Sequence, residues 1–206
     1  LAAGTTAIAA LFLCILAAGK GNPLALMLAM AILGTTLGFL PYNWGILNFR
    51  SWSYKSAIRN PQSAIFMGDS GSLFLGFILS SIAILLANQP YDLTGFIAPL
   101  VVIAVPILDT ALAILRRLSH RADPFGGDRQ HIYDLLASAG LGNRRAVLVI
   151  YAATAMLGTL SLIIVRLDPL RAILLAGGVV VAMGLIAIRL GAVGASGRQS
   201  DVVRQG

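Results

Sequence analysis

The sequence predicts an all-α fold, a polytopic transmembrane helical bundle of about six spans with a short cytosolic loop helix. Three observations predict this fold. Of the 206 residues, 58% are hydrophobic and only 11% are charged, whereas a soluble domain has about 25% charged residues. Several apolar runs approach the roughly 20 residues that cross a bilayer as a helix. Short polar segments with glycine and proline separate these runs.

The expected spans are six apolar segments. In chain order they are about Leu1–Ala18, Leu24–Leu40, Leu73–Ala87, Phe96–Leu115, Ala146–Val165 and Leu170–Leu190. Residues 19–23 are expected to form a tight turn between the first two spans, and residues 166–169 do the same between the last two. Glycines inside the spans permit close helix approach. The single Cys14 lies in an apolar run, so we interpret it as a packing residue.

Positive charge is unequally distributed between the two sides of such a bundle. Twelve of the fifteen Lys and Arg residues lie in loop 41–72, loop 116–145 and the tail from Arg189. The positive-inside rule therefore predicts that these segments face the cytoplasm. We expect residues 1–190 to form a transmembrane catalytic-domain fragment with cytosolic loops 41–72 and 116–145, and residues 191–206 to form a disordered basic tail. The net charge of +7 then reflects topology and anionic ligands or lipid headgroups, not nucleic acid.

Aromatic and basic residues alternate between Trp44 and Arg59 in the first cytosolic loop. Trp and Tyr favour the headgroup level of a membrane, and cations favour anionic lipid. This pattern is typical either of an interfacial element beside a lipid substrate or of a linker that follows the membrane surface.

The stretch Gly68-Asp69-Ser70-Gly71-Ser72 is one residue short of the GDSGG sequence of trypsin-like serine proteases. A protease would need a histidine base beside Ser70, and the only histidines lie in another loop of an all-helical chain. We instead expect a helix start, in which Gly68 allows a turn and Ser70 or Ser72 caps the helix.

That interpretation leaves Asp69 unexplained. A carboxylate at the edge of the hydrocarbon costs free energy unless it is paired or binds a cation. Mg²⁺ accepts one or two carboxylates together with substrate phosphates, and an exposed helix N-terminus favours phosphate. Asp69 is therefore predicted to be half of a Mg²⁺–diphosphate site.

A second carboxylate, Asp109, is expected inside the cytosolic end of the fourth span. Arg116 is seven positions further on and lies on nearly the same helix face. Two interpretations stay open for Asp109. It either forms a buried ion pair with Arg116 that holds the helix end, or it lines an active cleft.

A dense polar group lies in the second cytosolic loop. Asp128 is expected to cap a short helix from Arg129 to about Ala139, which Gly140 ends. His131 and Asp134 are three positions apart and so share one face of that helix. Arg and His side chains in such a cluster suit a diphosphate or a sugar nucleotide.

Three stretches together resemble the polyprenyl-phosphate N-acetylhexosamine-1-phosphate transferases, a family of integral-membrane enzymes. FLPYN (39–43) followed by SAIFMGDSGSLFLG (63–76) is similar to the family's FLxxN…PAxxFMGDxGSxxLG block. VPILDTALAILRR (105–117) and DPFGGDRQHIYDLL (123–136) are similar to the last span and catalytic loop of the undecaprenyl-phosphate GlcNAc-1-phosphate transferase branch. The opening LAAGTTAIAA resembles the stretch directly after the family's NxxNxxDGxDG motif.

The resemblance implies transfer of N-acetylhexosamine 1-phosphate, with GlcNAc as the expected sugar, from a UDP-sugar to polyprenyl phosphate in cell-envelope polysaccharide biosynthesis. UMP would leave, and Mg²⁺, or alternatively Mn²⁺, would be required. Asp69 matches the metal ligand. The implied catalytic residues are His131, Asp128 and Asp109, and the implied substrate-binding residues are Asn43, Arg129 and Ser70. The implied location is the bacterial inner membrane with a cytoplasmic active face and C-terminus, and a homo-oligomer is left open.

The sequence departs from the family pattern at three points. The family's DDxxD and NxxNxxDGxDG motifs would lie before Leu1, so we expect a C-terminal fragment that is inactive alone. Asn43 lies 26 positions before Asp69, against about ten in the family, which indicates an insertion of roughly 16 residues. The family's HxHH motif is replaced by His131-Ile132-Tyr133-Asp134. A transporter or channel subunit and a non-catalytic relative of the family are the alternative functions.

Overall fold

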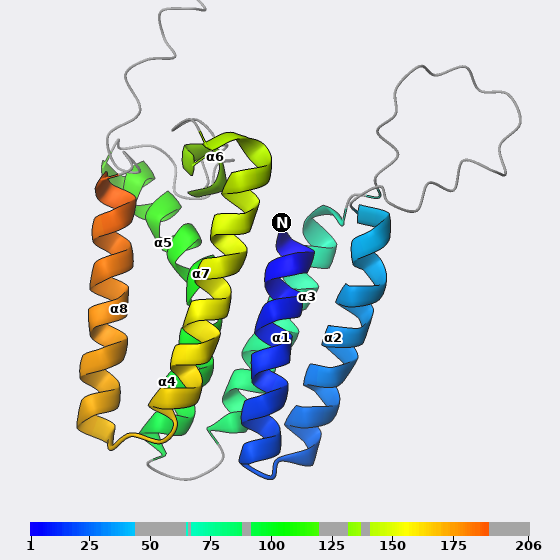
Figure 1. The fold of residues 1–206 in the computed structure, drawn as a ribbon, viewed down its shortest axis with the longest axis vertical. Coiled ribbons are helices and arrows are strands. Elements are labelled where there is room, and N and C mark those ends of the chain that lie inside the picture. The colour runs from blue at the N-terminus through cyan, green and yellow to red at the C-terminus, as the bar shows by residue number, and fades with distance from the viewer. Residues whose placement is uncertain (44–64, 66, 88–91, 120–131, 137–140, 190–206) are drawn as a thin grey trace, which may run out of the picture.

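The computed structural model of the chain describes residues 1–43, 65, 67–87, 92–119, 132–136 and 141–189 (Figure 1). Within these ranges all regular structure is helical, which confirms the predicted all-α class. The helices are α1 (Ala2–Gly19), α2 (Pro23–Asn43), α3 (Gly68–Leu86), α4 (Leu93–Val102), α5 (Ala104–Ser119), α6 (Ile132–Leu136), α7 (Gly142–Ile164) and α8 (Pro169–Arg189).

The helices include five that are long and apolar enough to cross a membrane, namely α1, α2, α3, α7 and α8. Helices α4 and α5 together satisfy the same criterion but are bent by 73° relative to each other, which fits a sixth, broken span or a re-entrant pair. The prediction of about six spans is confirmed for a multi-pass membrane protein. The expectation of one continuous helix over Phe96–Leu115 is wrong.

The break between α4 and α5 follows from Pro106 in the first turn of α5. Proline has no N–H to donate to the carbonyl of Val102, and its ring crowds that carbonyl. The neighbouring backbone hydrogen bonds are long, 3.3 Å from Ile103 N to Pro99 O and 3.4 Å from Ile107 N to Ile103 O. Proline is tolerated early in a helix, so α5 begins as a new helix on the far side of the bend.

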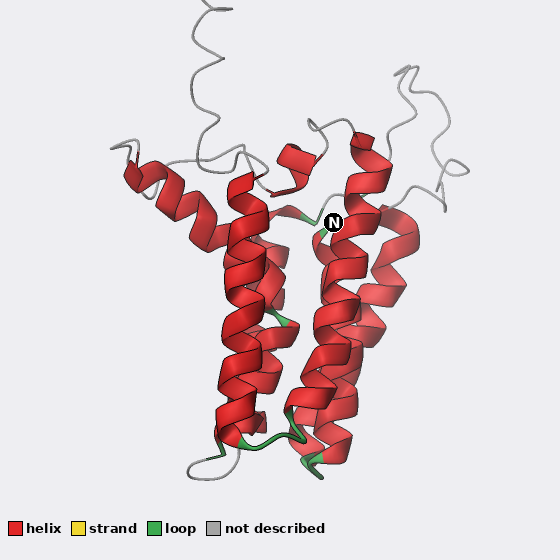
Figure 2. Ribbon diagram, turned by 60° about the vertical axis from the view of Figure 1, so that its left-hand side comes forward, coloured by secondary structure: helices red, strands yellow, loops and turns green. Residues whose placement is uncertain are grey.

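Successive long helices run in opposite directions, so the bundle has two distinct ends (Figure 1). The upper end of Figure 1 holds the beginnings of α1, α3 and α7, the ends of α2 and α8, and helix α6. The lower end holds the connections from α1 to α2, from α3 to α4 and from α7 to α8. Figure 2 shows the same two ends and the outward tilt of α5 at the upper end. The described parts of the stretches that carry the predicted chemistry, namely the end of α2, the start of α3 and helix α6, are therefore at the upper end.

Helix α1 lies at the centre of the packing, in contact with α2, α3, α4 and α7. Its buried face is built largely from small residues such as Ala10 and Ala17 around the fully buried Leu13. Small residues let helix backbones approach closely, which is how helices gain packing energy in a bilayer. Helix α8, in contrast, buries Ala172 and little else of its apolar surface.

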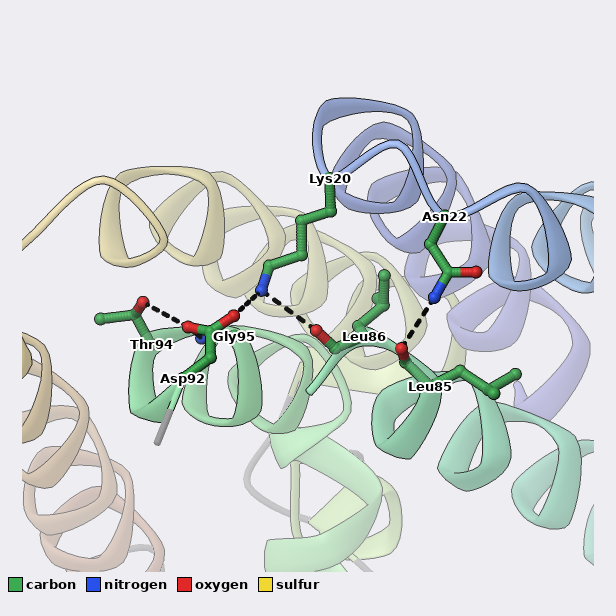
Figure 3. A network of polar contacts seen from close by, with 7 residues as sticks. All are labelled: Lys20, Asn22, Leu85, Leu86, Asp92, Thr94 and Gly95. Carbon is green, nitrogen blue, oxygen red and sulfur yellow. Dashed lines mark hydrogen bonds and ion pairs between the residues drawn. The ribbon is translucent and has the colours of Figure 1, made fainter. Parts of the chain in front are cut away.

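A polar network at the lower end fastens the first helices together (Figure 3). Lys20, after α1, forms an ion pair with Asp92 and donates to Leu86 O at the end of α3 over 3.0 Å. Asp92 is also the N-cap of α4, because Oδ1 accepts from Gly95 N at 2.8 Å. The hydrogen bond from Lys20, with smaller help from Gly95 N and Thr94, holds the pKa of Asp92 below its usual value against the opposing effect of burial.

Asn22 in the same turn joins α2 to α3. Its Nδ2 donates to Leu85 O over 2.8 Å, and its Oδ1 accepts from Ala25 N at 3.1 Å near the start of α2. Gly21 has a φ of 62°, a conformation that glycine adopts without strain. The expected tight turn over residues 19–23 is confirmed, and its polar side chains satisfy helix ends that would otherwise be unpaired.

Candidate functional site

The first candidate element is the beginning of α3. Gly68 has a φ of 71°, and the helix starts there, with Met67 as an N-cap that makes no side-chain capping bond. The expectation that Ser70 or Ser72 caps this helix is wrong, because both residues lie inside it. Ser72 Oγ instead donates to Asp69 O over 2.9 Å within the helix.

Asp69 is an exposed carboxylate in the first turn of α3. A negative charge is favourable there, because the first backbone N–H groups of a helix lack intrahelical partners and the helix dipole is positive at that end. Across the described parts of the chain, no three His, Cys, Asp or Glu side chains gather into a metal-binding group. One carboxylate suits Mg²⁺ when phosphate oxygens and waters supply the other ligands, so Asp69 fits a shared site better than a site made by protein alone.

Asn43 reaches the segment before α3 in spite of the long intervening loop. Its Nδ2 donates to Ile65 O over 2.9 Å, and Ile65 N donates to Tyr42 O at 3.2 Å. The bond from Asn43 joins two residues that are 22 positions apart. Its acceptor, Ile65, lies three positions before Gly68. The extra residues between them therefore do not remove Asn43 from the α3 start. Its expected contact with a nucleotide base stays a prediction.

Asp109 in α5 accepts a hydrogen bond from the first residue of α6. Asp109 Oδ1 lies 2.8 Å from Ile132 N, and the carboxylate is half-buried. A carboxylate on the first N–H of a helix is a capping interaction, here made by a residue 23 positions away. No local signal in the sequence could have indicated it, because the donor is a backbone group.

The remaining predicted site residues fall outside the described part of the chain. These are Asp128, Arg129 and His131, together with the side chain of Arg116 that one interpretation paired with Asp109. The short loop helix is confirmed over Ile132–Leu136, whereas its expected ends at Arg129 and Ala139 lie outside the described residues. His131 directly precedes Ile132, so Asp109 holds the backbone next to it.

A cavity of about 230 Å³ connects these elements at the upper end of the bundle. Its lining includes Ser72 and Gly76 from α3, Pro106 and Asp109 from α5, Ile132 and Tyr133 from α6, and Leu1, Ala2, Thr5 and Thr6 at the start of α1. Asn43, Asp69 and Ser70 are not among the lining residues. Ile150 and Thr154 of α7 complete it. The wall is mainly apolar, and Asp109 is the carboxylate that lines it.

Sequence reasoning missed the contributions of α7 and of the threonines in α1. Thr154 is buried and donates to Ile150 O over 2.8 Å, which is the usual way for threonine to satisfy its hydroxyl inside an apolar helix. The spacing of Thr154 from other polar residues in the sequence does not indicate a site. Its place at the cavity becomes visible only in the folded structure.

Comparison with known proteins gives two kinds of match. Residues 1–87 match the family model described as glycosyl transferase family 4. The "Probable undecaprenyl-phosphate N-acetylglucosaminyl 1-phosphate transferase" of Bacillus subtilis (strain 168) is 36% identical over 151 residues, which cover 73% of this chain and 38% of that protein.

Two further relatives have similar names. The decaprenyl-phosphate N-acetylglucosaminephosphotransferase of Mycolicibacterium smegmatis is 32% identical over 170 residues, covering 73% of this chain and 38% of the relative. The undecaprenyl-phosphate alpha-N-acetylglucosaminyl 1-phosphate transferase of Escherichia coli (strain K12) is 32% identical over 133 residues, covering 65% and 33%. The chain thus spans less than two fifths of the length of these relatives. No solved structure matches it significantly.

Proposed function

This chain belongs to glycosyl transferase family 4, and from that premise we propose that it forms part of an enzyme that transfers N-acetylhexosamine 1-phosphate from a UDP-sugar to polyprenyl phosphate. The relatives from Bacillus subtilis and Escherichia coli point to GlcNAc as the sugar. The activity belongs to a whole protein of which this chain supplies one wall of the active site. The site would face the cytoplasm of a bacterial inner membrane, and the pathway would be cell-envelope polysaccharide synthesis.

The observation that carries this proposal is the convergence on one cavity. The motif stretches 63–76, 105–117 and 123–136 are separated in sequence, yet each contributes residues to the same cavity of about 230 Å³. An apolar wall suits the lipid end of a polyprenyl phosphate, and polar groups at the membrane surface suit its phosphate. Motifs that shared only a fold, without a common site, would have no reason to meet at one end of the bundle.

The proposed reaction exchanges one phosphoanhydride bond for another and leaves the sugar–phosphate ester intact. An oxygen of the lipid phosphate attacks the β-phosphorus of the UDP-sugar, the bond from that phosphorus to the bridging oxygen breaks, and UMP leaves with the bridging oxygen. The product is a lipid diphosphate that carries the sugar. Catalysis of such a transfer depends mainly on positioning and on neutralising negative charge.

Each described residue then has a distinct part. Asp69 would hold Mg²⁺, or alternatively Mn²⁺, jointly with the diphosphate, and the metal would neutralise charge on it. Ser70 offers an exposed hydroxyl beside Asp69 for a substrate oxygen. Asn43 would meet the nucleotide. Asp109 holds the start of α6 through Ile132 N.

The residues outside the described ranges keep their predicted parts. Arg129 and His131 would contact the diphosphate or nucleotide, and Asp128 would shape the electrostatic potential of the cleft. The DDxxD and NxxNxxDGxDG motifs of the resemblance do not occur in this sequence. We therefore expect the 206-residue chain alone to have no turnover.

The assay that tests the proposal measures UMP release from UDP-GlcNAc with undecaprenyl phosphate and Mg²⁺. A longer protein that contains this chain should release UMP and form a lipid-linked sugar, and chelation of divalent cations should stop both. UDP-GalNAc serves as the comparison donor. Absence of lipid-linked product from a folded longer protein with either donor would contradict the proposal and favour a non-catalytic relative.

The alternative of a transporter or channel gains little from the broken span α4–α5. Transport sites at broken helices use polar groups and unwound backbone near the membrane midplane. At this break, Val102, Ile103, Ala104 and Val105 are all buried and apolar. The break instead directs α5 toward α6, where Asp109 makes its contact.

A further inference from the structure

Two adjacent arginines stand at the upper end of α7 and are not used by the proposed reaction. Arg144 and Arg145 are the third and fourth residues of the helix, and both are exposed. The first turn of a helix is the least favourable place for a cation, because the unpaired N–H groups and the helix dipole are positive there. Stability of α7 therefore does not account for them.

Helix α8 provides an internal comparison at the opposite end of the bundle. Arg171 is also the third residue of its helix, and Asp168 three positions earlier pairs with it at 3.2 Å. The residue three positions before Arg144 is the apolar Leu141. No ion pair involves Arg144 or Arg145 among the residues that the structure describes. Asp168 thus neutralises the arginine in the first turn of α8. Among the described residues, no acidic side chain pairs with the two arginines of α7.

The helix surface below the two arginines faces outward. Leu148 is four positions after Arg144 and is 63% exposed, and Val149 is four positions after Arg145 and is 42% exposed. Met156 and Ile163 continue the apolar exposed side of the helix. Residues four apart lie one above the other on a helix, so each arginine sits directly over a side chain that faces the lipid.

This side of α7 is separate from the cavity. The residues of α7 that line the cavity are Ile150 and Thr154, and the neighbouring Ala146 is fully buried on the same side. Arg144 is two positions, or about 200° of helix rotation, before Ala146. The two arginines are therefore exposed on a side of α7 that does not line the cavity, at the level where the exposed apolar surface of the helix ends.

We propose that Arg144 and Arg145 form a binding site for the phosphate headgroup of an anionic membrane phospholipid, whose acyl chains lie along Leu148, Val149 and Met156. Guanidinium groups bind phosphate oxygens through paired hydrogen bonds, and the apolar stripe below them fits acyl chains. The partner is a bilayer lipid rather than the polyprenyl phosphate substrate, because the site faces away from the cavity. The lipid-site proposal depends on family membership only for the premise that α7 crosses a membrane.

Native mass spectrometry of the detergent-purified chain tests the proposal. Phosphatidylglycerol and phosphatidylcholine with identical acyl chains are titrated separately, and inorganic phosphate is a third ligand. The wild-type chain should retain phosphatidylglycerol in preference to the other two. The double variant Arg144→Gln/Arg145→Gln should lose that retention by roughly 25-fold, since each arginine near an anionic surface contributes on the order of fivefold.

Two further variants separate this site from general positive charge. Arg166→Gln/Arg171→Gln removes the same charge from the lower end and should retain phosphatidylglycerol. Arg144→Lys/Arg145→Lys keeps the charge and should recover part of the binding. Circular dichroism and size-exclusion chromatography confirm that each variant is folded and has the wild-type oligomeric state. Four results would overturn the proposal. The two Gln variants could lose phosphatidylglycerol equally, or the wild-type chain could bind phosphatidylcholine or free phosphate as well as phosphatidylglycerol. The fourth is that the Arg144→Gln/Arg145→Gln variant changes its oligomeric state and does not lose lipid.

Discussion

At the scale of single residues, Asp109 shows how a carboxylate that lines a cavity can also hold a neighbouring helix in place. Its Oδ1 caps the backbone of α6 at Ile132, 2.8 Å away. The helix has only five residues, too few to be stable without tertiary support. The position of α6 therefore depends on this acceptor.

Two substitutions of Asp109 distinguish the role of its hydrogen-bond acceptor oxygen from the role of its negative charge. Asp109→Asn keeps an oxygen that can accept from Ile132 N, so hydrogen exchange at the α6 amides should change little. Asp109→Ala removes the acceptor and costs about 1–3 kcal/mol of local stability, so exchange at residues 132–136 should become faster by about five- to 150-fold. Equally fast exchange in both variants would contradict the capping role.

At the scale of elements, α1 and α7 pack in parallel through two reciprocal aromatic contacts. The ring of Phe12 from α1 lies against Gly158 of α7, and the ring of Tyr151 from α7 lies against Gly4 of α1. A Cβ added at either glycine would overlap the facing ring. The glycines are thus required by the close approach of two helices that both contribute to the cavity.

The Gly158→Ala variant tests this packing. Overpacking against Phe12 should destabilise the chain by about 1–3 kcal/mol, which is measured as a lower unfolding midpoint in detergent. The double variant Gly158→Ala/Phe12→Leu should recover part of the loss, since the two residues are in contact. Gly177→Ala on α8, where nothing lies near the added methyl group, is the matched control. An equal loss at Gly177 would contradict the account.

The lower-end network makes the connection of α1, α3 and α4 sensitive to acid. Asp92 has a lowered pKa in the folded chain, mainly because Lys20 donates to it. A lowered folded pKa means that the stabilisation is fully present above the ordinary Asp value of about 3.9 and is lost as pH falls through the lower folded value. Asp92→Asn should therefore lose stability at pH 7 and show a smaller further decrease on acidification than the wild type.

The measurement is the thermal unfolding midpoint of both chains in detergent from pH 7 down to about pH 2.5. Asp168→Asn, which removes an exposed acid from the same end, serves as the control. If Asp92→Asn and the wild type lose stability in parallel over the whole range, the ion pair to Lys20 does not contribute to folding.

At the scale of the whole molecule, the apolar runs predicted the spans well and their upper ends less well. Helices α3 and α7 begin at Gly68 and Gly142, several residues before the expected spans. Hydropathy indicates which residues suit the hydrocarbon of a bilayer, whereas a helix can extend beyond those residues. The bend before Pro106 was missed because the apolar run continues through it. The contact from Asp109 to α6 joins a side chain to a distant backbone N–H, and no sequence pattern marks such a donor.

The orientation of the bundle stays a prediction from the distribution of positive charge. On this account the upper end is cytoplasmic. In a Cys14→Ala background, a membrane-impermeant maleimide added to intact cells should label Asp168→Cys at the lower end and leave Asn143→Cys at the upper end unlabelled. Labelling of Asn143→Cys in unlysed cells would reverse the assigned sides.

The central claim is that Asp69, three positions before the cavity-lining Ser72 on α3, holds the metal ion of a phosphoglycosyl-transfer site. The most direct measurement is UMP release from UDP-GlcNAc by a longer, active protein that contains the chain, with Asp69→Asn compared with Asp168→Asn. We predict that Asp69→Asn lowers turnover by at least about a hundredfold, because a metal ion supplies several kcal/mol of charge stabilisation, while its folded yield and the activity of Asp168→Asn stay near wild type. Wild-type turnover in folded Asp69→Asn would contradict the account.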